Sequence, residues 1–384
     1  MEDIFKMTDD WGDIRPQSEI VLYGMGRIGR RVLPTIMKQF KVLFIIDKNS
    51  SENSILGIKI LQLPEAIKEL QGRKIKIVIT TVLAAYKEIS TDLEKAGFRE
   101  YIDFCHFERF AGEWNIRWRN HCVLSKIDTV ITSRCTLKCK NCNMFIGHVD
   151  EPHDMSLQSL KTNFDIFFDS VDFVYEYTLL GGEPLLHNDL LDIISYLVNS
   201  YGEKIGRINL ISNGTVLPDS KTLEFFAKYH VIVHISDYTA SLGYEKRLSK
   251  VVDSLSKAGI EHYVIPNNIW KDVVYPCLDY HTDNPGQHMI MCGHSTHSVD
   301  NGRLYWCDPA FAAEYFTGFK PKSDDYLDLA KNRRENSKYE ASLKILRYLL
   351  GDVNERGYMT ICEKCAGVGK DNDREVRAGI QMKG

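Results

Sequence analysis

Short apolar runs alternate with amphipathic segments through the first hundred residues. Apolar runs at residues 19–23, 42–46 and 75–82 predict strands, and a shorter run at 101–104 predicts a last one. Between them, apolar positions at helical spacing predict helices over 32–37 and 84–96. The alternation predicts a small open parallel sheet over about residues 18–106.

A second series begins after the aromatic and basic segment 114–120, which we interpret as a linker. Helices are predicted over 157–167, 190–198 and 248–258, and Gly202 and Gly259 follow the last two as stop signals. Strand-like runs lie at 129–132, 173–180, 208–212, 231–236, 262–265 and 288–291. Six strands alternating with helices predict a partial (β/α)6 barrel, too short for an eight-fold one.

The last hundred residues lack this alternation. Runs at 295–299 and 303–306 flank Asp300-Asn301-Gly302, which predicts a β-hairpin with a tight turn. A helix over 339–350 and a short cysteine-bearing tail follow. We therefore expect an α/β protein with three domains, at residues 1–118, 119–285 and 286–384.

Composition and net charge indicate which kinds of binding partner to expect. The 384 residues are 44% hydrophobic and 26% charged, which is typical of globular domains. The 48 basic and 52 acidic residues leave a net charge of -4, so no overall electrostatic footprint for nucleic acid or an anionic membrane is present. An acidic N-terminus and the lack of an apolar run of about 18 residues favour a cytoplasmic protein.

Three of the ten cysteines form a tight group directly after the strand at 129–132. Cys135, Cys139 and Cys142 have the spacing C-x3-C-x2-C. Three thiolates at this spacing can bind three irons of a 4Fe-4S cluster and leave the fourth iron open to a ligand. A zinc site is the alternative, with His148 as the nearest fourth ligand.

This loop resembles the cluster-binding loop of the radical S-adenosylmethionine (radical SAM) superfamily. Gly181-Gly182-Glu183-Pro184 looks like the family's GGEP motif, which implies contacts to the amino group of the methionine moiety. The resemblance also implies that Ser212 and Asn213 contact the ribose and carboxylate of S-adenosylmethionine, and that Ser236 makes a further polar contact. Each motif taken alone is compatible with an ordinary turn.

One position departs from the family pattern. The residue before the last cysteine of the loop is often aromatic in the family, whereas here it is Asn141. This difference puts stacking against adenine in doubt. The resemblance otherwise implies reductive cleavage of S-adenosylmethionine to a 5′-deoxyadenosyl radical, which abstracts a hydrogen atom from substrate carbon. A reducing flavodoxin or ferredoxin would supply the electron.

A second cysteine set lies in the C-terminal third. Cys292 and Cys307 flank the predicted hairpin, and Cys362 and Cys365 form a C-x2-C pair. The arrangement resembles the twitch domain, the short form of the SPASM extension of radical SAM enzymes. It implies an auxiliary 4Fe-4S cluster ligated by all four cysteines. A four-cysteine zinc ribbon has compatible spacing.

By analogy with twitch-type enzymes, we expect the auxiliary cluster to accept an electron while an alcohol carbon is oxidised by two electrons. The expected substrate is a sugar, an aminocyclitol or a nucleotide-linked small molecule. Epimerisation and modification of a ribosomally made peptide (RiPP) are competing readings. Cys277 is a candidate hydrogen donor for an epimerase, and His187 is one candidate base for alcohol oxidation.

The first sheet carries its own motif. Gly24, Gly26 and Gly29 form G-x-G-x-x-G between a strand and a helix, and Asp47 ends the next strand. This context favours a nucleotide-binding turn. The segment resembles small Rossmann-like domains of sugar-modifying proteins, which implies either nucleotide or nucleotide-sugar binding or a docking role. Two other readings of the whole chain are an NAD-dependent dehydrogenase with structural metal sites and a non-catalytic electron carrier or zinc-binding protein.

Overall fold

The structure is a computed structural model that describes residues 5–81, 83–292, 296–369 and 371–382. The chain divides into two compact units, Met1–Ser125 and Lys126–Gly384. The separation of a barrel, 119–285, from an extension, 286–384, stays a prediction. Among the described residues, no helix is both long enough and apolar enough to cross a bilayer.

The first unit is built on a six-stranded sheet with the order β3-β4-β2-β1-β5-β6. Strands β2 and β5 flank β1 in parallel, which puts the glycine turn after β1 at the point where the strand order reverses. The strands are β1 (Glu19–Tyr23), β2 (Lys41–Ile46), β3 (Ser54–Ile55), β4 (Ile58–Leu61), β5 (Lys76–Ile79) and β6 (Phe104–His106). The helices are α1 (Arg27–Gln39), α2 (Leu63–Leu70), α3 (Leu83–Lys95), α4 (Phe107–Arg109) and α5 (Asn115–Arg119).

Two expectations for this unit are wrong. The last strand forms at Phe104–His106, so it shares only residue 104 with the predicted run at 101–104. Val82, the last residue of the strand predicted at 75–82, lies outside the described residues. Segment 114–120 is not a linker, because Phe110–Trp114 is a π-helix that continues into α5. Trp114 stacks on Phe110 at 5.4 Å and meets Phe40 edge-on at 5.3 Å, so the aromatic residues belong to the core.

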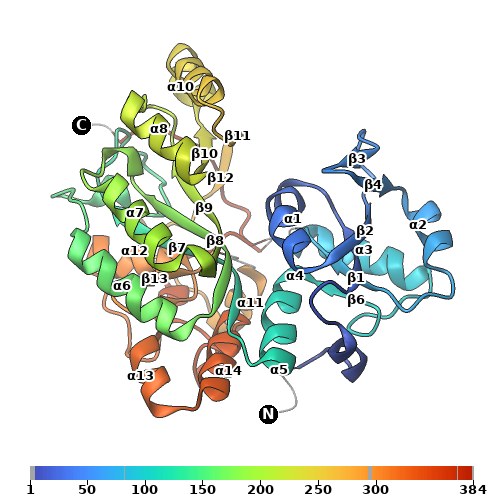
Figure 1. The fold of residues 1–384 in the computed structure, drawn as a ribbon. Helices are drawn as coiled ribbons and strands as arrows, with labels where there is room; N and C mark the ends of the chain where they lie inside the picture. Colours follow the sequence, from blue (N-terminus) through green and yellow to red (C-terminus); the bar gives the residue numbers. More distant parts are fainter. Residues whose placement is uncertain (1–4, 82, 293–295, 370, 383–384) are drawn as a thin grey trace. The chain divides into compact units, whose positions relative to one another are not determined.

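The second unit contains an eight-stranded sheet with the order β11-β10-β9-β8-β7-β13-β14-β15. Strands β8 to β11 pair in parallel, and helices α6, α7 and α8 follow one another along one face (Figure 1). The predicted α/β class is confirmed. The strands of this sheet are β7 (Val123–Thr132), β8 (Phe173–Gly181), β9 (Ile205–Ser212), β10 (Ile232–Asp237), β11 (His262–Pro266), β13 (Ser298–Asp300), β14 (Arg303–Tyr305) and β15 (Tyr326–Asp328).

Helices and a small ribbon complete the unit. Strands β12 (Ile269–Lys271) and β16 (Glu375–Arg377) form an antiparallel pair. The helices are α6 (Leu157–Ser170), α7 (Leu190–Tyr201), α8 (Ser220–Tyr229), α9 (Thr239–Leu242), α10 (Glu245–Lys257), α11 (Pro285–Cys292), α12 (Asp308–Thr317), α13 (Leu329–Glu335) and α14 (Lys338–Leu349). The predicted helices at 157–167, 190–198, 248–258 and 339–350 are confirmed.

The sixth predicted barrel strand, at 288–291, is wrong. Residues 285–292 form helix α11, and the side chain of Asn284 accepts a hydrogen bond from Gln287 N at 3.0 Å as a helix N-cap does. His288 and Met289 are buried, whereas Ile290 is 74% exposed. The apolar run therefore covers a helix with one buried face, and β13 takes the place beside β7.

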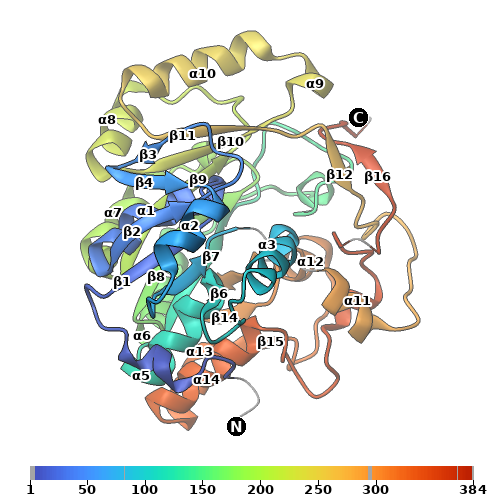
Figure 2. The ribbon, with the colours of Figure 1, turned by 90° about the vertical axis from the view of Figure 1, so that its right-hand side faces the viewer.

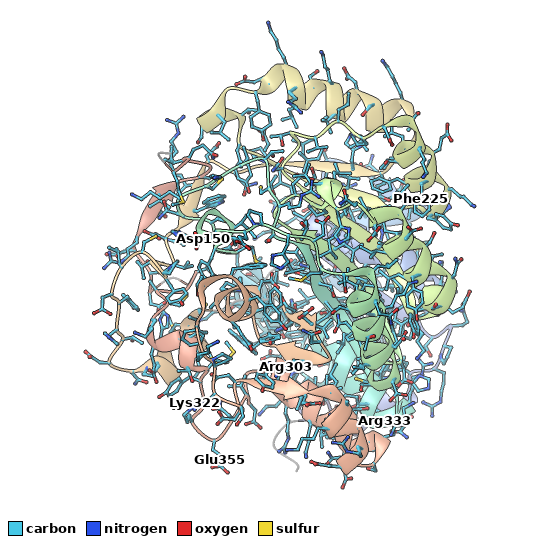
Figure 3. The ribbon with its side chains drawn as sticks, turned by 90° about the vertical axis from the view of Figure 1, so that its left-hand side faces the viewer. Asp150, Phe225, Arg303, Lys322, Arg333 and Glu355 are labelled. Atoms are coloured by element: carbon cyan, nitrogen blue, oxygen red, sulfur yellow. The ribbon has the colours of Figure 1, made fainter. Side chains whose placement is uncertain are left out.

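The predicted hairpin is confirmed over the described residues, with residue 295 outside them. Asn301 and Gly302 both have positive φ, +48° and +69°, as a two-residue hairpin turn requires. Arg303, labelled in Figure 3, begins β14 and lies 4.2 Å above the Tyr326 ring of β15. The hairpin thus extends the sheet of β7 to β11 and carries Cys307 at its end.

Asn163 of α6 hydrogen-bonds to the backbone of this hairpin through its buried side chain. Its buried amide donates to Val299 O at 3.1 Å and accepts from Gly302 N at 3.0 Å. Asn163→Ala should lower the free energy of unfolding by about 2–4 kcal/mol, because both buried backbone groups lose their partner. Urea unfolding measures this change. Gln158→Ala, at an exposed position of the same helix, is the matched control, and equal stabilities for the two variants would contradict the assignment.

Candidate active site

The three-cysteine loop lies where several strands of the second unit end. Cys135, Cys139 and Cys142 line one cavity of about 220 Å³. Five other residues expected from the sequence line the same cavity, namely Gly181, Gly182, Ser212, Asn213 and Ser236. The carboxyl ends of parallel strands meet at one edge of a sheet, which explains why segments as far apart in sequence as Cys135 and Ser236 converge here.

Two glycines hold the end of β8 against the cysteine loop. Gly182 N donates to Thr132 O at 2.9 Å, and Glu183 N donates to Arg134 O at 2.8 Å. A Cβ atom on Gly181 would lie 2.2 Å from Thr132 O, and one on Gly182 would lie 2.3 Å from Arg134 O. Any other residue at either position would therefore push the loop away.

Glu183 joins the ends of β8 and β9. Its carboxylate accepts from Ser212 Oγ at 3.0 Å, from Asn213 N at 2.8 Å and from Leu185 N at 3.2 Å. Burial raises the pKa of Glu183 to about 7. The carboxylate is fully occupied inside the scaffold, so in this structure it positions the cavity wall and does not line the cavity itself.

Two of the three cysteine sulfurs receive side-chain N–H groups. Asn213 Nδ2 donates to Cys135 Sγ at 3.5 Å, and Gln381 Nε2 donates to Cys139 Sγ at 3.3 Å. Burial raises the pKa of the Cys135 thiol to about 12 and that of Cys139 to about 11. N–H donors aimed at sulfur fit a cluster ligated by thiolates, whose charge such donors stabilise.

Within the described part of the chain, no group of three or more His, Cys, Asp or Glu side chains lies close enough to hold a single metal ion. A cubane cluster binds each thiolate through a different iron, so its ligands need not lie within reach of one ion.

Besides Glu183, four candidate residues do not line this cavity. They are Asn141, Pro184, His187 and Cys277. His187 Nε2 lies 3.0 Å from Met155 O, and its Nδ1 accepts from Asp189 N at 3.0 Å, so both ring nitrogens are used in the scaffold. Cys277 is exposed, with its sulfur 3.4 Å from His148 Nε2. The geometry therefore favours neither as a group that meets substrate in this cavity.

Among the residues of the cavity wall that sequence reasoning missed are Tyr238, Trp270 and Asp308. Tyr238 and Trp270 pack edge-on at 5.3 Å. Asp308 is the first residue of α12, is buried, and accepts a hydrogen bond from Ser298 Oγ. The Asp-Pro pair after Cys307 is a sequence signal for the start of a helix. The local sequence does not indicate that this helix begins at the cavity.

The second cysteine set also comes together. Cys292, Cys307, Cys362 and Cys365 line one small cavity whose wall is otherwise largely apolar, with Val273, Trp306 and Ile361. Gly367 N donates to Cys365 Sγ at 3.3 Å, and Val368 N donates to Cys292 Sγ at 3.5 Å. Burial raises the pKa of the Cys365 thiol to about 12, and burial also raises the pKa of the Cys307 thiol. Four thiols with N–H donors fit a fully ligated cluster.

The glycine motif of the first unit borders a cavity of about 400 Å³, which Gly24, Gly26 and Asp47 line. Gly29 lies behind it, where a Cβ atom would meet Gly24 O at 2.1 Å, so this glycine permits close packing of α1 on the turn. Asp47 accepts from Met25 N at 2.6 Å. The Asp47 carboxylate, which we expected to bind a ribose, therefore accepts a hydrogen bond from the backbone of the glycine turn.

A sheet that presents three cysteines and a glycine pair at its carboxyl edge defines an α/β protein with a site for a thiolate-ligated cofactor. Residues 129–265 match the family model described as the Radical SAM superfamily. Over this segment the chain matches the superfamily that its cysteine loop resembles. The matched residues contain the three-cysteine loop and strands β8 to β10, and they end before Cys292.

Two curated relatives are similar in sequence to part of this chain. An S-adenosylmethionine-dependent nucleotide dehydratase of Selenomonas ruminantium is 30% identical over 109 residues, 28% of this chain and 37% of the relative. A probable GTP 3′,8-cyclase of Methanococcus maripaludis is 38% identical over 88 residues, 23% of this chain and 28% of the relative. The chain thus spans about a third of the length of these curated relatives.

Among solved structures, BtrN in complex with AdoMet and 2-DOIA superposes with a TM-score of 0.37 at 15% sequence identity. The superposition covers 64% of this chain and 93% of BtrN.

The close approach at Gly182 gives a direct test of the site's construction. Gly182→Ala should lower the iron bound by the three-cysteine loop several-fold after anaerobic reconstitution, because the new methyl group displaces the backbone of Arg134 and the side chain of Cys135. Gly202→Ala is the control, since the nearest atom to its new Cβ lies 3.9 Å away. Equal iron content in both variants would contradict the packing argument.

Proposed function

We propose that the chain is a radical SAM oxidoreductase that oxidises a hydroxyl-bearing carbon of a sugar, an aminocyclitol or a nucleotide-linked small molecule. The observation that carries the proposal is the adjacency of Cys307 and Asp308. Cys307 lines the four-cysteine cavity, and the next residue, Asp308, lines the three-cysteine cavity. A residue that would ligate the electron-accepting cluster is therefore directly followed in sequence by a carboxylate that can accept a proton.

Cys135, Cys139 and Cys142 would hold the first cluster, and Cys292, Cys307, Cys362 and Cys365 would hold the second. Gly181, Gly182, Ser212, Asn213 and Ser236 would contact S-adenosylmethionine. When bound, these groups supply a radical that takes a hydrogen atom from carbon and an acceptor for one further electron. Trp270 and Tyr238 supply aromatic wall area that excludes water from the reacting carbon.

Asp308 is suited to act as the base. Alcohol oxidation releases the hydroxyl proton, and a carboxylate oxygen on the cavity wall can accept it. Ser298 donates to Asp308 Oδ1, which orients the carboxylate. Lys126 Nζ lies 2.9 Å from buried Asp128 Oδ2, so this lysine already has a carboxylate partner of its own. The hydrogen atom, the proton and the second electron together account for a two-electron oxidation.

The first unit supports a second binding role, for a nucleotide or nucleotide-sugar. Its cavity is lined by Lys48 and Asn49 as well as the glycine turn. Tyr23 lines the same cavity and is 1% exposed, and its buried hydroxyl has no hydrogen-bond partner among the described residues. A ligand hydroxyl or base would satisfy this buried group. The expected electron donor is a flavodoxin or ferredoxin.

Substitutions in the two cysteine sets should have different effects on the reaction. Cys139→Ala should abolish cleavage of S-adenosylmethionine, whereas Cys307→Ala should keep abortive cleavage and lose product. Dithionite assays that count 5′-deoxyadenosine and oxidised product separately measure both. Cys277→Ala is the control, since this exposed thiol borders neither cavity. Full product yield from Cys307→Ala would refute the electron route, and loss of product from Cys277→Ala would favour epimerisation.

The proton route has its own test. Asp308→Asn should lower kcat for product about 10²–10⁴-fold, because the amide cannot accept the hydroxyl proton. Transfer of deuterium from labelled substrate into 5′-deoxyadenosine should continue, since hydrogen abstraction does not need the carboxylate. Asp279→Asn, with a side chain 85% exposed, serves as the control. An unchanged kcat in Asp308→Asn would exclude it as the base.

A further inference from the structure

The C-terminal tail pairs with the three-cysteine loop. Lys140 N donates to Ile380 O at 2.7 Å, and Met382 N donates to Lys138 O at 2.7 Å. Cys139 and Gln381 form an antiparallel bridge between these two bonds. The last described residues thus act as a short strand against the loop, although Cys139 and Gln381 lie 242 residues apart.

The side chain of Gln381 reaches the sulfur of Cys139. Its Oε1 accepts from Lys138 N at 2.7 Å, and its Nε2 donates to Cys139 Sγ at 3.3 Å and to Gly379 O at 2.6 Å. Because Lys138 N can only donate, the oxygen of the amide must face it. The amide nitrogen is therefore fixed as the group that meets the sulfur.

The tail is anchored before it reaches the loop. Strand β16 pairs with β12, which carries Trp270, and Ala378 N donates to Asn268 O at 3.0 Å (Figure 2). At its start, Asn372 Nδ2 donates to Gly367 O at 2.7 Å, beside the four-cysteine cavity. The segment 371–382 therefore runs from one cysteine set to the other, and its end is held firmly enough to orient one amide.

We propose that Gln381 is a positioning residue of the three-cysteine site, whose N–H bond to Cys139 raises the reduction potential of the cluster bound there and retains the cluster. This inference rests on the proposed function. Reduction adds negative charge to a cluster, and a donor at a ligating sulfur stabilises that charge. Asn213 makes the corresponding bond to Cys135, at 3.5 Å. Two amides from distant parts of the chain thus meet two of the three sulfurs.

The test is a redox titration of the anaerobically reconstituted full-length protein, followed by electron paramagnetic resonance (EPR). The first cluster is identified by the response of its signal to added S-adenosylmethionine. Gln381→Met removes the N–H donors at similar volume, and Gln381→Glu removes them and adds a negative charge. In both variants the reduction potential of the first cluster should shift to more negative values, with the larger shift in Gln381→Glu. Gln158→Ala should match the wild type.

Iron retention under a chelator gives the second readout. Gln381→Met should lose iron from the first cluster several-fold faster than the wild type, and Gln158→Ala should not. Wild-type potential together with wild-type iron retention in Gln381→Met would overturn the inference. A wild-type protein without an S-adenosylmethionine-sensitive signal would instead overturn the proposed function, so the two failures are distinguishable.

Discussion

The close approach of two backbones is the constraint on which the site depends. Gly181 and Gly182 have no Cβ atom, and this lets the end of β8 bond directly to Thr132 and Arg134 at the start of the cysteine loop. The loop has no regular secondary structure of its own to hold its thiols in place. The hydrogen bonds to the end of β8 therefore fix the conformation of the loop. A methyl group at either glycine would disrupt these bonds.

Polar groups with little solvent exposure complete the scaffold around this contact. Glu183 bonds Ser212 and the backbone of Asn213, and the side chain of Asn213 bonds Cys135 in turn. The motif residues are thus linked in a chain of hydrogen bonds from β8 through β9 to Cys135, a proposed cluster ligand. Burying a carboxylate has a cost, seen in the raised pKa of Glu183, and its three donors offset that cost. The motif works as one unit, so its members cannot be assigned separate roles from spacing alone.

The sequence predicted the parts of the fold that local periodicity determines. The strands from β7 to β11, the hairpin turn at Asn301-Gly302 and the two cysteine sets follow from local pattern and spacing. The strand expected at 288–291 failed because a four-residue apolar run fits a buried strand and a half-buried helix equally, and only the Asn-Pro cap separates them. Asp308, Trp270 and Gln381 could not be found this way. Each reaches the site through tertiary pairing over more than a hundred residues, and a single sequence carries no signal for such contacts.

We propose that the two cysteine sets have different tasks, since three thiolates leave one iron open and four leave none. The most direct test is iron analysis and EPR of the anoxically reconstituted wild-type protein, with and without S-adenosylmethionine. The account predicts about eight irons per chain in two clusters, of which only one changes its signal when the sulfonium is added. Zinc in place of iron, or iron whose signal is indifferent to S-adenosylmethionine, would contradict it.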